Sequence, residues 1–503
     1  MKKSIIITGA GIAGLSAGCY GQMNGYSTHI FEMDTRPGGV CTSWKRKGYT
    51  IDGCMHWLVG SGPASIFYRG WEELGIMQNH TFVDHDEYLR VEGKDGKSFA
   101  LYSDPDRLEE HMKELAPEDS DVIEDFIKGI KKSIGFEMPV DKAPELYSLF
   151  DKVKMLFKIL PYLGFMRKWG KMTIGEFASR FENPFMREAF LAPVGDMAKF
   201  PMLALLMPVA WLHQKTAGYP LGGSLEFSKT IEKRYLDLGG KISYKSPVIK
   251  ILVENDEAVG IRLTDGTEHR GDIVISAADG RTTIFDMLEG KYINDKIQGY
   301  YDNLPLFPPL LHVAFGVART FDELPHSVSG FNLPLDEPIT IAGKELTRLP
   351  LHVYNFDSSL APEGKTVIKV MINTVFDYWN ELHKDPERYK TQKEQIADQL
   401  IALLDQRFPG LADQVEMRDV ATPITWERYT GNWQGSYEGW LPTTKTFGMR
   451  MSKTLPGLHN FYMVGQWVEP GGGLPPAAMS GRNVIQIICK KDKRKFVTTI
   501  PSR

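Results

Sequence analysis

The 503-residue chain has few cysteines, a small net charge and no long apolar run. Its four cysteines, at positions 19, 41, 54 and 489, lack the paired spacing of metal-binding motifs and need not form disulfides. We therefore expect no metal site and a reducing compartment. The net charge of −4 gives no sign of a nucleic-acid partner. No apolar run reaches the length of a membrane-spanning helix.

The N-terminus has glycines set between two apolar runs. Ser4–Thr8 is β-branched and predicts a buried strand, and Ser27–Phe31 predicts a second strand that leads into Glu32. Between them stands Gly9-Ala10-Gly11-Ile12-Ala13-Gly14, followed by small residues that suit a helix. A turn of this kind brings a helix N-terminus to a pyrophosphate, and the Glu32 carboxylate can bind both hydroxyls of a ribose. The sequence therefore predicts a dinucleotide site.

A second glycine turn, Thr35-Arg36-Pro37-Gly38-Gly39, follows the acid directly. A simple NAD site does not need such a turn, whereas a loop of this kind passes along the flavin in some FAD enzymes. From here on the chain resembles FAD enzymes of the amine-oxidase and phytoene-desaturase superfamily. The series Gly38-Gly39-Val40-Cys41 is closer to the retinol-saturase and carotenoid-isomerase branches, because many other members carry arginine after the glycine pair.

The resemblance continues to the end of the chain. Tyr219–Ser224, a helix over 225–238 and strands over 248–253, 259–263 and 273–276 follow in the order that the superfamily has. A segment over 461–476 and a helix over 477–488 resemble the part that brings the flavin ring onto a helix N-terminus. The two ends of the chain are therefore expected to build one site.

The resemblance implies that FAD is bound without a covalent link, because Cys489 lies beyond the C-terminal motif. It also implies cofactor contacts from both ends of the chain and from the backbone of one strand residue. These residues are Gly9, Gly11, Ala13, Gly14, Glu32, Met33, Arg36, Gly38, Gly39, Val40, Val248, Gly465, Gln466, Gly473, Leu474 and Pro475.

The length and the order of segments predict an α/β fold with more than one domain. We expect a Rossmann-type FAD-binding domain over 1–83, 215–289 and 456–495, with an inserted substrate domain of mixed sheet and helices. The insertion is expected to be helical over 84–214. A substrate-binding domain is expected over 290–455, where aromatic-rich strands over 311–318, 351–356 and 366–373 surround a helix over 391–407.

Within the insertion, the stretch from Leu146 to Lys171 is amphipathic and basic. A helix of this kind can lie in a membrane interface with its apolar residues in the lipid. It can equally pack on its own domain with a solvated basic face. The expected localisation is cytoplasmic, and the first interpretation adds peripheral attachment to the inner face of the membrane.

Flavin chemistry at carbon–carbon bonds needs an apolar pocket and a group that moves a proton. His56 is a catalytic candidate because imidazole exchanges protons near neutral pH, and a buried structural histidine is the alternative. Asp196 is the second candidate because its apolar surroundings would raise its pKa, and a cap or surface residue is the alternative. The substrate pocket is expected to include Trp57, Tyr219, Trp467 and Glu469.

Three functions fit these patterns. The first is an FAD-dependent oxidoreductase that desaturates, saturates or isomerises a long apolar isoprenoid or polyene, with an electron acceptor or donor that the sequence does not identify. The second is a flavin amine oxidase. The third is a non-enzymatic lipid-binding escort protein of the same fold, against which the intact glycines and Glu32 argue.

Overall fold

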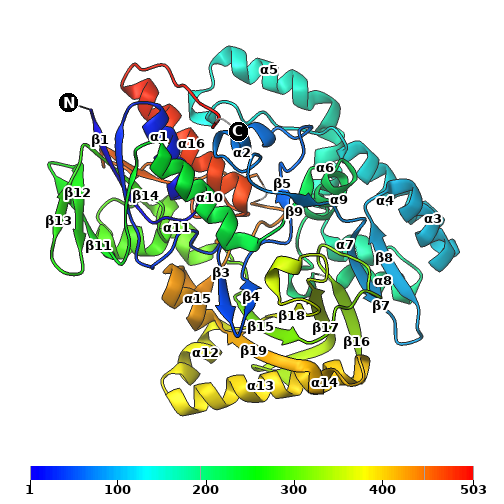
Figure 1. Cartoon of the computed structure of the whole chain (residues 1–503). Coiled ribbons are helices and arrows are strands. Elements are labelled where there is room, and N and C mark those ends of the chain that lie inside the picture. The colour runs from blue at the N-terminus through cyan, green and yellow to red at the C-terminus, as the bar shows by residue number, and fades with distance from the viewer. Residues whose placement is uncertain (1, 193, 447, 502–503) are drawn as a thin grey trace.

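The computed structural model describes residues 2–192, 194–446 and 448–501, with the backbone alone for Asp196. One layer is a five-stranded parallel sheet (Figure 1). Its strands run in the order β10 (Lys241–Ser243), β2 (Ser27–Phe31), β1 (Ser4–Thr8), β14 (Ile273–Ser276) and β20 (Phe461–Met463). The two predicted N-terminal strands and the last strand of the chain therefore belong to one sheet, as the resemblance implied.

Both faces of this sheet are covered, as is usual for parallel sheets. Ile5 and Ile7 of β1 pack in one core with helices α1 (Ile12–Met23), α10 (Gly223–Asp237) and α16 (Leu474–Lys491). On the other face, Ile6 shares a core with residues of β11 (Val248–Glu254) and β12 (Glu257–Leu263), which form an antiparallel sheet with β13 (Glu268–Arg270). This arrangement confirms the predicted α/β fold with a Rossmann-type layer.

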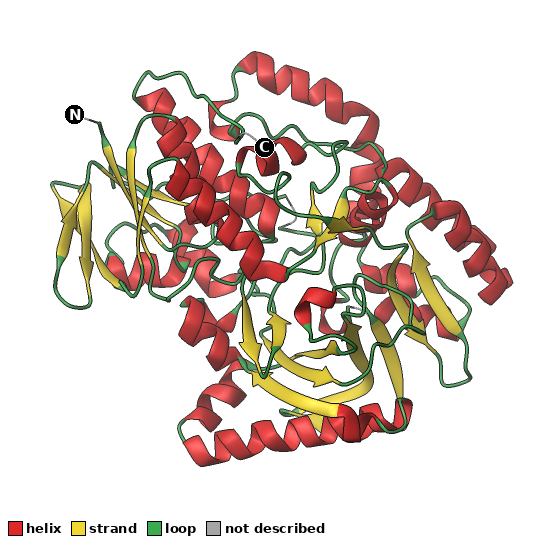
Figure 2. Ribbon diagram, in the orientation of Figure 1, coloured by secondary structure: helices red, strands yellow, loops and turns green. Residues whose placement is uncertain are grey.

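The second layer is a seven-stranded mixed sheet with the long helix α13 (Pro386–Arg407) along one side (Figure 2). Leu400 and Leu404 of α13 share a core with Val313 and Val370 of the sheet. The strand order is β19 (Val415–Ala421), β15 (Leu310–Val317), β18 (Thr366–Asn373), β17 (Lys344–Val353), β16 (Phe331–Ile341), β7 (Glu87–Glu92) and β8 (Ser98–Tyr102).

The region over 84–214 is not helical throughout, so that part of the prediction needs correction. Strands β7 and β8 form a hairpin that extends the large sheet, because Arg90 pairs in parallel with Phe331 of β16. A further strand, β9 (Ala217–Pro220), pairs with β5 (Leu58–Val59) and β6 (Phe82–Val83). The helices of the region are α3 (Pro105–Leu115), α4 (Ser120–Ser133), α5 (Leu149–Ile159), α6 (Leu163–Lys171), α7 (Ile174–Ala178), α8 (Pro184–Leu191) and α9 (Leu203–His213).

Helix α5 lies at the periphery of the molecule, beyond α4 and α6 (Figure 1). None of its residues is buried. Leu149, Phe150 and Phe157 are 79%, 76% and 70% exposed. The next helix, α6, packs into the core of the region through Phe165 and Trp169. In the described residues, none of the helices is both long and apolar enough to cross a membrane.

The first and last helices of the chain approach each other through glycine. A Cβ placed on Gly481 of α16 would lie 2.5 Å from the Ala13 oxygen and 2.7 Å from the Ala17 nitrogen of α1. The Ser16 hydroxyl of α1 donates to the Ala478 oxygen of α16 at 2.6 Å. The two helices therefore contact each other almost backbone to backbone, with no room for a side chain at position 481.

We predict that Gly481→Ala lowers the free energy of unfolding by about 1–3 kcal/mol, because the added methyl meets backbone atoms that cannot rotate away. Gly164→Ala in α6 is the matched control, since a Cβ placed there would have nothing within 4 Å and alanine is the better helix former. Thermal melts of both variants check this. A Gly481→Ala variant as stable as the wild type would contradict the close contact.

Candidate active site

A large cavity of about 1700 Å³ lies between the two sheets and the helical region. Ligand pockets usually measure roughly 300–1,000 Å³, so this one has room for a dinucleotide and a second molecule. Of the predicted cofactor and pocket residues, most line it: Gly9, Gly11, Ala13, Glu32, Met33, Gly38, Gly39, Val40, His56, Trp57, Val248, Gly465, Gln466, Trp467, Gly473, Leu474 and Pro475. The fold thus brings the N-terminal and C-terminal motifs to one space.

Two helix N-termini open into this cavity. Helix α1 begins after Gly11 and α16 begins after Gly473, and neither cap is closed by a side-chain hydrogen bond. The free N–H groups and the helix dipole at such ends favour negative charge. Gly38 is held beside α1 by its own N–H, which donates to the Ala10 oxygen at 2.9 Å. This end of the cavity suits the phosphates of a dinucleotide.

Glu32 is fixed at the end of β2 with its carboxylate at the cavity. One carboxylate oxygen accepts from the Ala10 N–H at 2.6 Å and the other from the Asp34 N–H at 2.8 Å. Burial raises the pKa of the carboxyl, while these N–H donors act in the opposite direction. Glu32 therefore ties the glycine turn to β2, and its carboxylate is placed where it fits the hydroxyls of a ribose.

Four predicted residues are not among the described residues that line the cavity. Gly14 instead faces the glycine turn: a Cβ at this position would lie 2.0 Å from the Gly9 oxygen, so only glycine lets α1 start so close to β1. Arg36 donates to the Ser43 oxygen at 3.1 Å. Tyr219 is fully buried against Tyr354 and Phe356. Glu469 pairs with Lys453 at 2.9 Å.

The two catalytic candidates have different fates. His56 lines the cavity and stacks on His352 at 4.6 Å, and its Nε2 has no hydrogen-bond partner among the described residues. Burial, with His352 and Lys369 nearby, lowers the pKa of His56 well below its usual range, so the ring is neutral at physiological pH. Asp196 belongs to the short 3₁₀ helix Gly195–Met197, but its side chain lies outside the described part of the chain.

Sequence reasoning missed a buried lysine, Lys369, which lies behind the loop that contains Gly53, Cys54 and His56. Lys369 of β18 is fully buried and donates to the Asp52 oxygen at 2.8 Å. Burial lowers the pKa of Lys369 to about 8. Because Gly53, Cys54 and His56 line the cavity, Lys369 positions that loop from behind. No local pattern marks it, since an alternating strand with one lysine usually turns that lysine to solvent.

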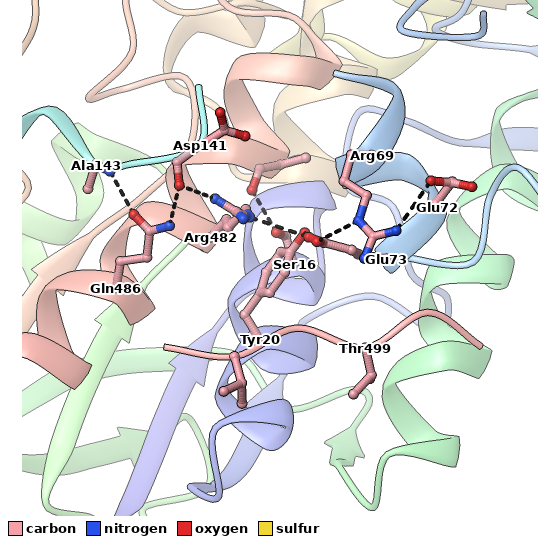
Figure 3. Close-up of polar contacts among 12 residues, drawn as sticks. Ser16, Tyr20, Arg69, Glu72, Glu73, Asp141, Ala143, Arg482, Gln486 and Thr499 are labelled. Atoms are coloured by element: carbon pink, nitrogen blue, oxygen red, sulfur yellow. Dashed lines mark hydrogen bonds and ion pairs between the residues drawn. The ribbon is translucent and has the colours of Figure 1, made fainter. Parts of the chain in front are cut away.

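The wall on the side of the helical region includes Phe136, Met138 and Val140, from the segment 135–143 between α4 and α5. Side chains of helix α16 hold backbone groups of this segment (Figure 3). Arg482 and Gln486 donate to the Asp141 oxygen at 2.8 and 2.7 Å, and the Ala143 N–H donates to Gln486 at 2.6 Å. The buried Glu73 carboxylate accepts from Arg482 and Tyr20 and ties this group to α1.

Comparison with known proteins agrees with this geometry. The model of the flavin containing amine oxidoreductase family matches residues 12–489. The chain belongs to this family. The structure of a putrescine oxidase variant has the same fold, with a TM-score of 0.60, 12% identity and coverage of 98% of this chain and 99% of that one.

Two curated relatives of this flavoprotein extend over nearly its whole length. A chloroplastic prolycopene isomerase of Daucus carota is 24% identical over 493 residues, which cover 95% of this chain and 78% of the relative. A 4,4'-diapophytoene desaturase (4,4'-diapolycopene-forming) of Methylomonas sp is 26% identical over 519 residues, which cover 98% and 96%.

The cofactor of this oxidoreductase is FAD. The residues present fit it: two open helix N-termini for the phosphates, a ribose carboxylate, and a glycine cradle that stays open because no side chain fills it. When bound, FAD supplies the acceptance and donation of hydride. The chain's own residues bind it, orient it and exclude water.

We predict that Glu32→Ala weakens FAD binding by about 1.5–3 kcal/mol, because it removes a charge-assisted contact. This corresponds to roughly a 10- to 150-fold rise in Kd. Asp34→Asn is the control, since its carboxylate accepts from Thr35 and lies beyond the cavity wall. Fluorescence titration of flavin-free protein measures both. Equal FAD affinity of folded Glu32→Ala and wild type would show that Glu32 is not at the ribose.

Proposed function

We propose that this flavoprotein acts on carbon–carbon bonds of a long apolar isoprenoid or polyene, by desaturation, saturation or cis–trans isomerisation. The observation that carries the proposal is the part of the cavity beyond the FAD motifs. Its walls there include aliphatic and aromatic side chains, among them Leu205 of α9 and Phe200 and Phe307 from two loops. Such side chains bind a ligand by burying apolar area, which a long hydrocarbon chain offers and a small charged amine does not.

The names of the relatives support the same class, since one is a prolycopene isomerase and the other a diapophytoene desaturase. The family and its solved members also include amine oxidases, and that activity is the second candidate. The hypothesis of a non-enzymatic escort protein is not retained, because the family is one of flavin-dependent enzymes.

Anaerobic mixing with polyenes distinguishes the reactions. Bleaching of oxidised FAD by substrate identifies a desaturase, and reoxidation of pre-reduced FAD by substrate identifies a saturase. Isomerised product formed only by the reduced enzyme, with no net change in the flavin, identifies an isomerase. We expect one of these three results. A flavin that no polyene changes but that an amine reduces would replace the proposal by amine oxidation.

We also propose that α5 and the following 3₁₀ turn η3 (Leu160–Tyr162) attach the enzyme to an anionic membrane surface. At 3.6 residues per turn, Leu149, Val153, Leu156 and Leu160 share one stripe with Phe150 and Phe157 beside it. All six are exposed. Exposed lysines at 152, 154 and 158 flank this stripe, which suits acidic headgroups on either side of an inserted apolar face.

The location supports an entry route for an apolar substrate. The segment 135–143 lines the cavity, and only the short turn η2 (Pro144–Leu146) and a few residues separate it from α5. We propose that a substrate enters the cavity from the lipid on this side, which would reduce the cost of hydrating a long hydrocarbon chain.

We predict that the wild type binds anionic vesicles more strongly than neutral ones, and less strongly at high salt. Replacing Phe150, Phe157 and Leu160 with serine should release the enzyme from vesicles without loss of FAD. Leu236, Ile249 and Val375 replaced with serine make a matched control, because they are exposed apolar residues elsewhere. A wild type that binds no vesicle of any composition would contradict the attachment.

A further inference from the structure

Glu438 is a cavity residue to which neither the sequence motifs nor the cofactor site gives a role. It lies in the loop between the 3₁₀ turn η7 (Trp433–Gly435) and β20 and lines the cavity. Among the described residues no group donates a hydrogen bond to its carboxylate and no cation pairs with it. By contrast Asp279, another acid that lines the cavity, is buried and accepts from the Thr282 and Trp433 N–H groups at 2.8 and 2.9 Å.

The backbone around Glu438 is fixed, so its carboxylate has a defined place. The Phe307 N–H donates to the Gly439 oxygen at 2.9 Å, and the Gly471 N–H donates to the Trp440 oxygen at 3.1 Å. A Cβ on Gly472 would lie 2.5 Å from the Glu438 Cβ, and one on Gly473 would lie 4.0 Å from the Glu438 Oε1. The carboxylate therefore sits at the loop that starts α16, between the cofactor end and the apolar end of the cavity.

The groups that face Glu438 carry no charge at neutral pH. They are Cys54 from the loop after β4 (Tyr49–Asp52), Tyr88 of β7 and Tyr437 of its own loop. Burial raises the pKa of Tyr88 to about 12 and that of Tyr437 further, and the pKa of Cys54 lies well above its usual range through its hydrogen bond to Cys41 and burial. Burial alone raises the pKa of Glu438 to about 7. Both protonation states are therefore available under physiological conditions.

We propose that Glu438 is the catalytic residue that gives a proton to, or takes a proton from, the substrate carbon. This rests on the proposed function, since each reaction on a carbon–carbon bond moves one proton. In saturation, one carbon would receive a hydride, with its two electrons, from bound reduced FAD. The Glu438 carboxylic acid protonates the neighbouring carbon and is left as carboxylate, which then takes up a proton from solvent.

The same carboxyl group can serve in desaturation and in isomerisation. In desaturation the Glu438 carboxylate takes the proton from one carbon, while bound oxidised FAD would accept the hydride, with its two electrons, from the neighbouring carbon. In isomerisation the acid protonates one polyene carbon, the adjoining bond rotates in the resulting cation, and the carboxylate takes the proton back without net redox change; the negative charge of bound reduced FAD would stabilise that cation, so the step depends on the reduced enzyme. His56 is neutral and is therefore assigned to the cavity wall, not to proton transfer.

Glu438→Gln tests the assignment, with Glu427→Gln as the matched control. Glu427 is half-buried and also has a raised pKa, but it does not line the cavity. For Glu438→Gln we expect kcat to fall by about 10²–10⁴-fold with KM little changed. The wild-type kcat should fall above about pH 7 when the acid acts and below it when the carboxylate acts. This dependence of kcat on pH should be absent from Glu438→Gln and unchanged in Glu427→Gln. In Glu438→Asp it should remain, at a lower kcat.

A second readout needs no substrate. Infrared difference spectra of the FAD-loaded wild type should contain a protonated-carboxyl band that titrates near pH 7 and is missing from Glu438→Gln. The absence of that band overturns the assignment, and so does a Glu438→Gln enzyme with wild-type kcat and pH profile. A wild type that changes no polyene contradicts the proposed function instead, and the infrared titration then decides on Glu438 by itself.

Discussion

The contact between α1 and α16 is the constraint on which the rest of the structure depends. The chain's first helix and its last one meet through Gly481, and Gly14 lets α1 start against β1, so the glycine turn and the C-terminal loop open toward the same space. A side chain at either position would separate two helix N-termini that must serve one dinucleotide. The same helix α16 also holds the segment 135–143 through Arg482 and Gln486, so it connects the cofactor end with the substrate wall.

Desolvation sets the chemistry of the remaining cavity. In a space lined mainly by apolar side chains, charge is costly unless it is paired. Three ionisable groups respond in different ways: His56 becomes neutral, Lys369 keeps a backbone partner, and Glu438 has a pKa near neutrality. The cavity thus combines an apolar binding surface with a carboxyl group that can exchange a proton, which is what carbon–carbon chemistry beside a flavin requires.

The sequence predicted best what depends on short stretches of chain. Local residue patterns predicted the strands at Ser4–Thr8 and Ser27–Phe31 and the glycine turns. The parallel pairing of these two strands confirms the fold class. The hairpin β7–β8 was missed because its place depends on a parallel pairing with Phe331, far away in the chain. The motif that contains Tyr219 stands at the expected place in the chain, but Tyr219 does not line the cavity. Its side chain packs instead against Tyr354 and Phe356, which come from the other layer. Glu438 and Lys369 could not be predicted because tertiary burial alone makes them unusual.

We propose that one cavity, built from both ends of the chain, holds FAD without a covalent bond and an apolar unsaturated chain beside it. Acid precipitation of freshly purified protein, followed by mass spectrometry of what is released, tests this. We expect one FAD per chain in the supernatant together with a long apolar isoprenoid or polyene. Flavin that remains in the pellet, or protein that carries no flavin at all, would contradict it.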